Sequence, residues 1–128
     1  MRVLIDTHVF LWWNTNDPQL SLRAREIISD GNSEVFLSAA SAWEIAIKAA
    51  RKRLILPEEP AQYVSSRMNQ HRFQSLPVQV SHALHVYDLP FHHDDPFDRL
   101  LIAQSQLEGL PLITTDSEIK KYKVEIVW

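Results

Sequence analysis

A short apolar run near the start of the chain stops abruptly at a carboxylate, and this feature constrains the fold more than any other. Val3, Leu4 and Ile5 directly precede Asp6. A run that is apolar on both faces of a strand is typical of a central strand in a parallel sheet. Ligands bind at the carboxyl ends of such strands, because loops and helix N-termini meet there. The run therefore predicts that Asp6 lies at the functional edge of a sheet.

Strand-like and helix-like segments alternate along the rest of the chain. Further short strands are expected at 35–37, 73–76, 112–114 and 124–127, and Pro77 places 73–76 at a sheet edge. Helices are expected from about residue 10 and over 22–28, 39–52, 61–70, 81–87, 96–108 and 116–121. This alternation predicts an α/β fold of three layers, a central parallel sheet of about five short strands flanked by helices, within one domain over residues 1–128.

Composition excludes several classes of site. The chain has no cysteine, so a disulfide framework, a thiol nucleophile and a Cys-type zinc site are ruled out. Its two glycines are too few for a Gly-rich phosphate loop. The net charge of −3 leaves local basic residues or metal ions to hold any phosphate-rich partner. With no signal-like or membrane-spanning stretch, we expect a soluble cytoplasmic protein without a membrane partner.

Four acidic residues fall at strand ends or in the first turns of helices. Asp6 and Asp116 each follow a short strand, and neighbouring strands about 4.8 Å apart would bring both within reach of one cation. Asp98 lies on the inward stripe of its helix, where an unpartnered carboxylate is costly. Glu44 lies in the Ala-rich helix predicted over 39–52.

Each acid also has a structural explanation. Asp6 fits the position of a helix cap, and Thr115 and Glu118 fit a capping box around Asp116. Asp98 would complement a helix dipole behind an Asp95 cap. Glu44 fits either a capping box from Ser41 or an i,i+4 ion pair with Lys48.

The joint occurrence of the four acids favours a ligand site. Four carboxylates crowded at one edge repel one another and raise one another's pKa unless a cation neutralises them. An oxygen-rich, sulfur-free ligand set suits Mg²⁺ or Mn²⁺. Such ions polarise a phosphoryl oxygen and activate water for in-line attack. Hydrolysis of a phosphodiester is the chemistry that this site would support.

Four segments carry a resemblance to a known family. They are MRVLIDTHVFLWW, LSAASAWEIAIK, HHDDPFDRLLIAQ and PLITTD, which together span essentially the whole chain in order. The chain resembles PIN-domain ribonucleases, specifically VapC-type toxins of type II toxin–antitoxin pairs. The resemblance implies a PIN-like fold, a Mg²⁺/Mn²⁺-dependent endoribonuclease acting on RNA, a cognate antitoxin as protein partner, and a homodimer.

The resemblance also assigns roles to residues. The four acids of the family fall on Asp6, Glu44, Asp98 and Asp116, as catalytic residues and metal ligands. Thr7 and Thr115 match flanking polar positions that would orient a ligand or water.

Two other functions stay open at this point. Aspartyl-phosphate phosphatases also place an aspartate at the end of the first strand, but a second aspartate is expected two residues later, where this chain has His8. A non-catalytic PIN-like module that binds proteins would keep the acids only as caps.

Basic and aromatic residues add secondary expectations. Arg99 should point outward from its helix, where it would meet an RNA backbone, and His93 would touch a substrate phosphate. A metal site at His82 and His85, or at His92 and His93, is disfavoured, because H-E-x-x-H spacing is lacking. Trp12, Trp13 and Trp43 are expected to be core or interface anchors rather than base-stacking platforms.

Overall fold

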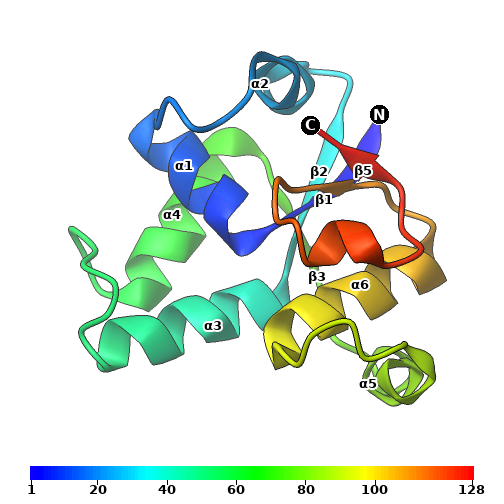
Figure 1. Cartoon of the computed structure of the whole chain (residues 1–128). Helices are drawn as coiled ribbons and strands as arrows, with labels where there is room; N and C mark the ends of the chain where they lie inside the picture. The colour runs from blue at the N-terminus through cyan, green and yellow to red at the C-terminus, as the bar shows by residue number, and fades with distance from the viewer.

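Five strands form one parallel sheet in the computed structural model, which describes residues 1–128 (Figure 1). The spatial order is β3-β2-β1-β4-β5. The strands are β1 (Arg2–Ile5), β2 (Glu34–Ser38), β3 (Gln74–Leu76), β4 (Leu112–Ile113) and β5 (Ile126–Val127). The predictions that the first strand is central and that the segment before Pro77 is an edge strand are therefore confirmed.

Six α-helices and two short 3-10 helices connect the strands. They are α1 (Thr7–Thr15), α2 (Leu22–Ser29), α3 (Ala39–Ala50), α4 (Pro60–His71), α5 (Val80–His85), η1 (Val86–Asp88), α6 (Pro96–Glu108) and η2 (Ile119–Lys121). Most lie within two residues of the expected ranges. Two differ: α1 begins about three residues earlier than expected, and the helix expected over 116–121 is reduced to the three residues of η2.

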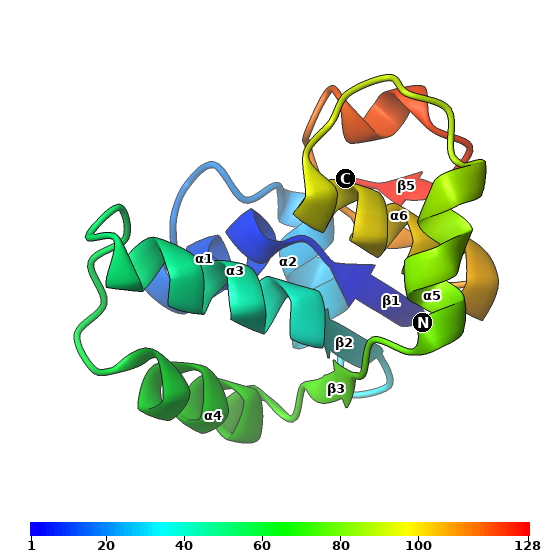
Figure 2. The ribbon, with the colours of Figure 1, turned by 90° about the horizontal axis from the view of Figure 1, so that it is seen from below.

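Alternate side chains of β1 enter two different cores. Val3 and Ile5 pack with residues of α1, α2 and α4, whereas Leu4 packs with residues of α6 and η2. Figure 2 shows α5 and α6 on one side of β1 and β2, with α1, α2 and α4 on the other. Helices therefore cover both faces of the sheet, as the doubly apolar first strand requires.

Two junctions in the chain have clear local causes. Ser38 is the last residue of β2 and caps α3, because its hydroxyl accepts the backbone N–H of Ala40 at 3.0 Å. The same hydroxyl donates to buried Gln104 Oε1 at 2.5 Å and so joins α3 to α6. The second junction is the C-terminal end of α6, where Gly109 adopts a φ of 64°, the left-handed conformation that glycine accepts without strain.

All five strands run in the same direction, so their carboxyl ends lie at one edge of the sheet. Asp6 follows β1, and Thr114 follows β4, which pairs directly with β1 through Ile5 and Ile113. The N-termini of α1 and α3 begin at this edge as well. The topology therefore brings the end of β1 and the start of α3 to the sheet edge at which the sequence predicts the candidate residues.

None of the helices has the length and apolar character that crossing a membrane requires.

Candidate acidic site

Asp6 is held by a hydroxyl from the neighbouring strand rather than acting as a cap. The Asp6 side chain makes no capping hydrogen bond to α1. Its Oδ2 instead accepts a hydrogen bond of 2.8 Å from Thr114 Oγ1. Asp6 is only 5% exposed, and burial raises the pKa of its carboxyl above the usual value, against the opposing effect of the Thr114 bond. The capping interpretation of Asp6 is therefore wrong.

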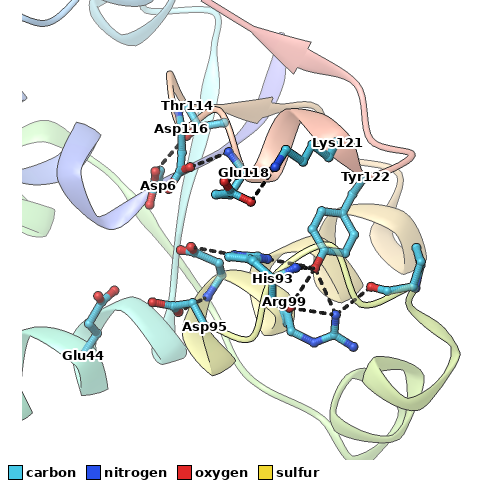
Figure 3. Close-up of polar contacts among 12 residues, drawn as sticks. Asp6, Glu44, His93, Asp95, Arg99, Thr114, Asp116, Glu118, Lys121 and Tyr122 are labelled. Atoms are coloured by element: carbon cyan, nitrogen blue, oxygen red, sulfur yellow. Dashed lines mark hydrogen bonds and ion pairs between the residues drawn. The ribbon is translucent and has the colours of Figure 1, made fainter.

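Asp116 is tied to the same threonine. Its backbone N–H donates to Thr114 Oγ1 at 3.0 Å, and its Oδ1 accepts the N–H of Glu118 at 2.8 Å. The expected capping box between Thr115 and Glu118 is absent, because Asp116 itself takes the backbone N–H and the chain turns into η2 only at Ile119. Figure 3 shows Asp6 and Asp116 beside each other at Thr114.

Asp98 lies in the first turn of α6 with its side chain 15% exposed. Burial raises the pKa of Asp98 to about 7, and the negative charges of Asp95, Asp6 and Asp116 act in the same direction. Asp95 caps the helix as expected, with its Oδ1 accepting the Asp98 N–H at 2.9 Å. Asp98 is therefore close enough to Asp6 and Asp116 for their charges to disfavour its ionised form.

Glu44 reaches the edge from α3. Its side chain is 7% exposed and pairs with Lys48 Nζ at 2.6 Å, which confirms the i,i+4 ion pair. The alternative capping box with Ser41 does not form, since Ser38 caps α3. The charge of Glu44 contributes to the raised pKa of Asp6. Figure 3 shows its side chain pointing from α3 toward the side of the site that holds Asp6.

Arg99 does not point outward, and this expectation is wrong. The residue is 4% exposed, and its guanidinium donates to the carbonyls of Val86, Leu89 and Pro90. It also donates to the Tyr122 hydroxyl at 2.9 Å. Arg99 is thus an internal clamp that fastens the segment before α6 to the segment after η2.

His93 connects this clamp to Asp98, and Figure 3 shows the His93 ring beside the Tyr122 hydroxyl. Its Nδ1 lies 2.8 Å from the Tyr122 hydroxyl, and its Nε2 lies 3.1 Å from Asp98 Oδ2. The hydrogen bond to His93 opposes the rise in the pKa of Asp98. His93 therefore holds one carboxylate oxygen of Asp98 in place.

The two threonines proposed as supporting residues occupy different positions. Thr7 is buried, and its hydroxyl donates to Ser41 Oγ at 2.9 Å, which joins the start of α1 to α3. Thr115 lines an open cavity of about 220 Å³ together with Asp6, His8, Trp12 and Asp116. Their roles toward a ligand stay predictions.

Sequence reasoning missed Thr114 and Tyr122. The only available signal for Thr114 was a hydroxyl at the end of an apolar strand. No local sequence signal identified Tyr122, because its partners Arg99 and His93 lie 23 and 29 residues away in the chain.

No three Asp, Glu or His side chains lie close enough together here to hold a single metal ion. His82 and His85 instead bond to Glu108 and Gln106 of α6, at 2.8 and 2.7 Å. The acids nevertheless fit a hard cation in charge and donor type: Asp6 and Asp116 form no ion pair, and burial and repulsion disfavour the ionised forms of Asp6 and Asp98. The joint ligation of a metal by Asp6, Glu44, Asp98 and Asp116 stays a prediction.

Fold and site together define an α/β protein with buried and half-buried carboxylates gathered at the carboxyl edge of a parallel sheet. The model of the PIN domain family matches residues 3–125. The chain belongs to the PIN domain family, and the resemblance seen in its motifs is confirmed.

Individual relatives agree with this assignment. The chain is 28% identical over 122 residues to Ribonuclease VapC22 of Mycobacterium tuberculosis, covering 94% of this chain and 92% of that protein. The solved structure of VapBC2 from Rickettsia felis, bound to a DNA fragment from its promoter, matches with a TM-score of 0.73 at 11% identity, over 99% of this chain and 98% of that one. A toxin–antitoxin complex from Klebsiella pneumoniae matches with a TM-score of 0.67 at 17% identity, over 98% and 96% of the two chains. At these identities the two solved structures support the fold alone.

Proposed function

We propose that this protein is a Mg²⁺- or Mn²⁺-dependent endoribonuclease that acts as the toxin of a toxin–antitoxin pair. The observation that carries the proposal is the convergence of Asp6, Asp98 and Asp116 on one sheet edge, with the pKa of Asp98 raised to about 7. The likeness to a protein named as a VapC ribonuclease supports the choice of RNA as substrate.

The carboxylates would hold the divalent ion, and the bound ion would polarise the scissile phosphate and lower the pKa of the attacking water. Thr114 fixes the orientation of Asp6 through its hydroxyl. His93 fixes Asp98, and Lys48 balances the charge of Glu44. These contacts preorganise oxygen ligands that would otherwise repel one another and turn away.

Asp6→Asn and Asp98→Asn test the catalytic site. Each substitution keeps the shape of the side chain and removes the ionisable carboxyl group. We expect each purified variant to fold normally by circular dichroism and to lose RNA cleavage in the presence of Mg²⁺ or Mn²⁺. Asp30→Asn, on the exposed turn after α2, is the matched control and should cleave RNA like the parent. Cleavage at the parental rate by both site variants would rule out the four-acid site.

Divalent-ion binding tests the metal requirement separately from activity. Isothermal titration with Mn²⁺ should show binding to the parent that Asp116→Ala weakens or abolishes. A protein that binds no divalent ion, yet keeps a stable fold, would instead be a non-catalytic PIN-like module. Phosphorylation of Asp6 by a phosphate donor would point to aspartyl-phosphate chemistry.

The partner part of the proposal concerns an antitoxin. Structures of this fold include toxin–antitoxin complexes, although their sequences share less than a quarter of their residues with this chain. We expect the product of the adjacent upstream reading frame to form a stable complex with this protein and to suppress its RNA cleavage. Co-expression followed by size-exclusion chromatography checks both, and the elution volume of the free protein checks the expected homodimer. Separate elution of the two proteins would remove the antitoxin from the proposal.

A further inference from the structure

An aromatic wall, formed by His8 and Trp12, lines the open cavity at the sheet edge together with the carboxylates. The cavity of about 220 Å³ is lined by Asp6, Asp116 and Thr115 together with His8 and Trp12 of α1. The proposed phosphodiester chemistry uses the acids but leaves the two aromatic rings without a role. The sequence favours a core or interface anchor at Trp12, but its place in this cavity leads to a different role. We propose that Trp12 is the stacking platform for a nucleobase of single-stranded RNA next to the cleaved phosphate, an inference that rests on the proposed function.

The position of Trp12 supports this role. The indole packs against the core that contains Val3 and Ile5. It also meets the ring of Trp128 edge to face, with ring centroids 6.2 Å apart. The ring of His8, one turn earlier in α1, lies 5.9 Å from it and is inclined by 36°. Trp12 is thus a half-buried indole that packs against the core and Trp128 and lines the same cavity as Asp6 and Asp116.

The chemistry of the cavity favours a base over a phosphate at this wall. Asp6 and Asp116 repel an anion, and Arg99, which the sequence placed outside, is occupied internally. A nucleobase is flat and uncharged, and stacking on an aromatic side chain is a common mode of binding single-stranded RNA. The base would occupy the aromatic side of the cavity, and its phosphate would face the carboxylates only with the divalent ion of the proposed function bound between them.

Trp13 provides a matched control within the same helix. It is the next residue and also half-buried, but it contacts the ring of His71 with centroids 5.7 Å apart and does not line this cavity. Trp12→Leu and Trp13→Leu therefore remove the same side chain from neighbouring positions. Only the first should change RNA binding.

The kinetic experiment uses a short single-stranded RNA with a mapped cleavage site, and the same RNA with an abasic ribose on either side of that site. Loss of one stacked base corresponds to roughly a 5- to 150-fold rise in KM. We expect this rise for Trp12→Leu with intact RNA, with little change in kcat. It should vanish on one of the two abasic RNAs, because the base that Trp12 contacts is already missing. Equal losses for Trp12→Leu on intact and on both abasic RNAs, or equal effects of Trp12→Leu and Trp13→Leu, would overturn the proposal.

Fluorescence gives a readout without turnover. The same RNA is added to Asp98→Asn protein, and stacking should quench an emission component that disappears in Asp98→Asn/Trp12→Leu but persists in Asp98→Asn/Trp13→Leu. Quenching without cleavage by any form of the protein would refute the ribonuclease and retain the base site. Cleavage by the parent without Trp12-dependent quenching would refute the base site alone.

Discussion

Thr114 Oγ1 is hydrogen-bonded to Asp6 Oδ2 at 2.8 Å, although the two residues are 108 positions apart in the chain. The same oxygen accepts the backbone N–H of Asp116 at 3.0 Å. One buried hydroxyl therefore organises two of the four candidate acids. This is possible because β1 and β4 are adjacent and parallel, so their ends meet.

Thr114→Val should disconnect these acids while keeping the shape of the side chain. Asp6 loses its hydrogen-bond donor, and the Asp116 N–H loses its acceptor, so we expect a loss of about 1–3 kcal/mol in the free energy of unfolding. RNA cleavage should fall at least about tenfold, because Asp6 is no longer oriented. Urea unfolding and initial cleavage rates measure the two effects. Thr114→Ser, which keeps the hydroxyl, should cleave nearly as fast as the parent; a Val variant that does the same would show that Thr114 does not orient Asp6.

The raised pKa of Asp98 predicts how stability depends on pH. The pKa is about 7 in the folded protein against 3.8 ordinarily, so between about pH 4 and pH 7 the folded protein holds a proton that the unfolded chain has released. Asp98 therefore makes the free energy of unfolding fall as pH rises through this window. Asp98→Asn removes the effect and should stabilise the metal-free protein at pH 8 by up to about 4 kcal/mol.

Thermal unfolding in EDTA from pH 4 to pH 8 checks this expectation. The parent and the exposed-site control Asp30→Asn should show the same slope, and Asp98→Asn a smaller one. Adding Mg²⁺ at pH 8 should stabilise the parent more than Asp98→Asn, because the ion favours the ionised carboxylate. Identical pH profiles for parent and Asp98→Asn would mean that Asp98 titrates normally.

Arg99→Lys should be strongly destabilising despite keeping the charge. A lysine cannot replace the planar guanidinium, whose N–H groups donate to three carbonyls and to the Tyr122 hydroxyl. We expect a loss of about 3–5 kcal/mol, as for a buried charge that loses its partners. Arg51→Lys, at the exposed end of α3, is the control and should unfold within about 0.5 kcal/mol of the parent. Matching urea midpoints for the two variants would mean that Arg99 is not the clamp described above.

Lys48→Met tests the ion pair at Glu44. The lysine side chain is 40% exposed, so the pair contributes no more than about 1 kcal/mol to stability. Removing Lys48 leaves the Glu44 carboxylate without its cation, and we expect Mn²⁺ to bind more tightly in isothermal titration. Lys52→Met, just after α3, provides a control for the loss of one positive charge. Weaker or unchanged binding in Lys48→Met would argue that Glu44 is no ligand.

Helix ends were predictable from the sequence where capping or helix-terminating residues mark them. Asp95, Pro96 and Gly109 mark both ends of α6, and the observed bounds agree with the expected 96–108. The helix expected over 116–121 was wrong because its first N–H groups are bonded by Thr114 and Asp116 in a turn. That competition depends on where β4 ends in three dimensions, which local patterns do not contain.

The positions of the candidate acids were predictable from the sequence, and the residues that hydrogen-bond to them were not. Strand ends and helix starts identify Asp6, Asp98 and Asp116, since parallel topology fixes their common edge. The inward direction of Arg99 depends on the segment 86–91, which folds over α6 and supplies carbonyl oxygens. Helical periodicity indicates only which face a residue occupies, and it does not reveal what covers that face.

The central place of β1 also sets the order of events during synthesis. β1 is the first strand to be translated, but its neighbour β4 comes more than a hundred residues later. The contacts that link Asp6 to Thr114 and Asp116 therefore cannot form until nearly the whole chain has left the ribosome. A growing chain therefore carries no assembled acidic edge until β4 has paired with β1.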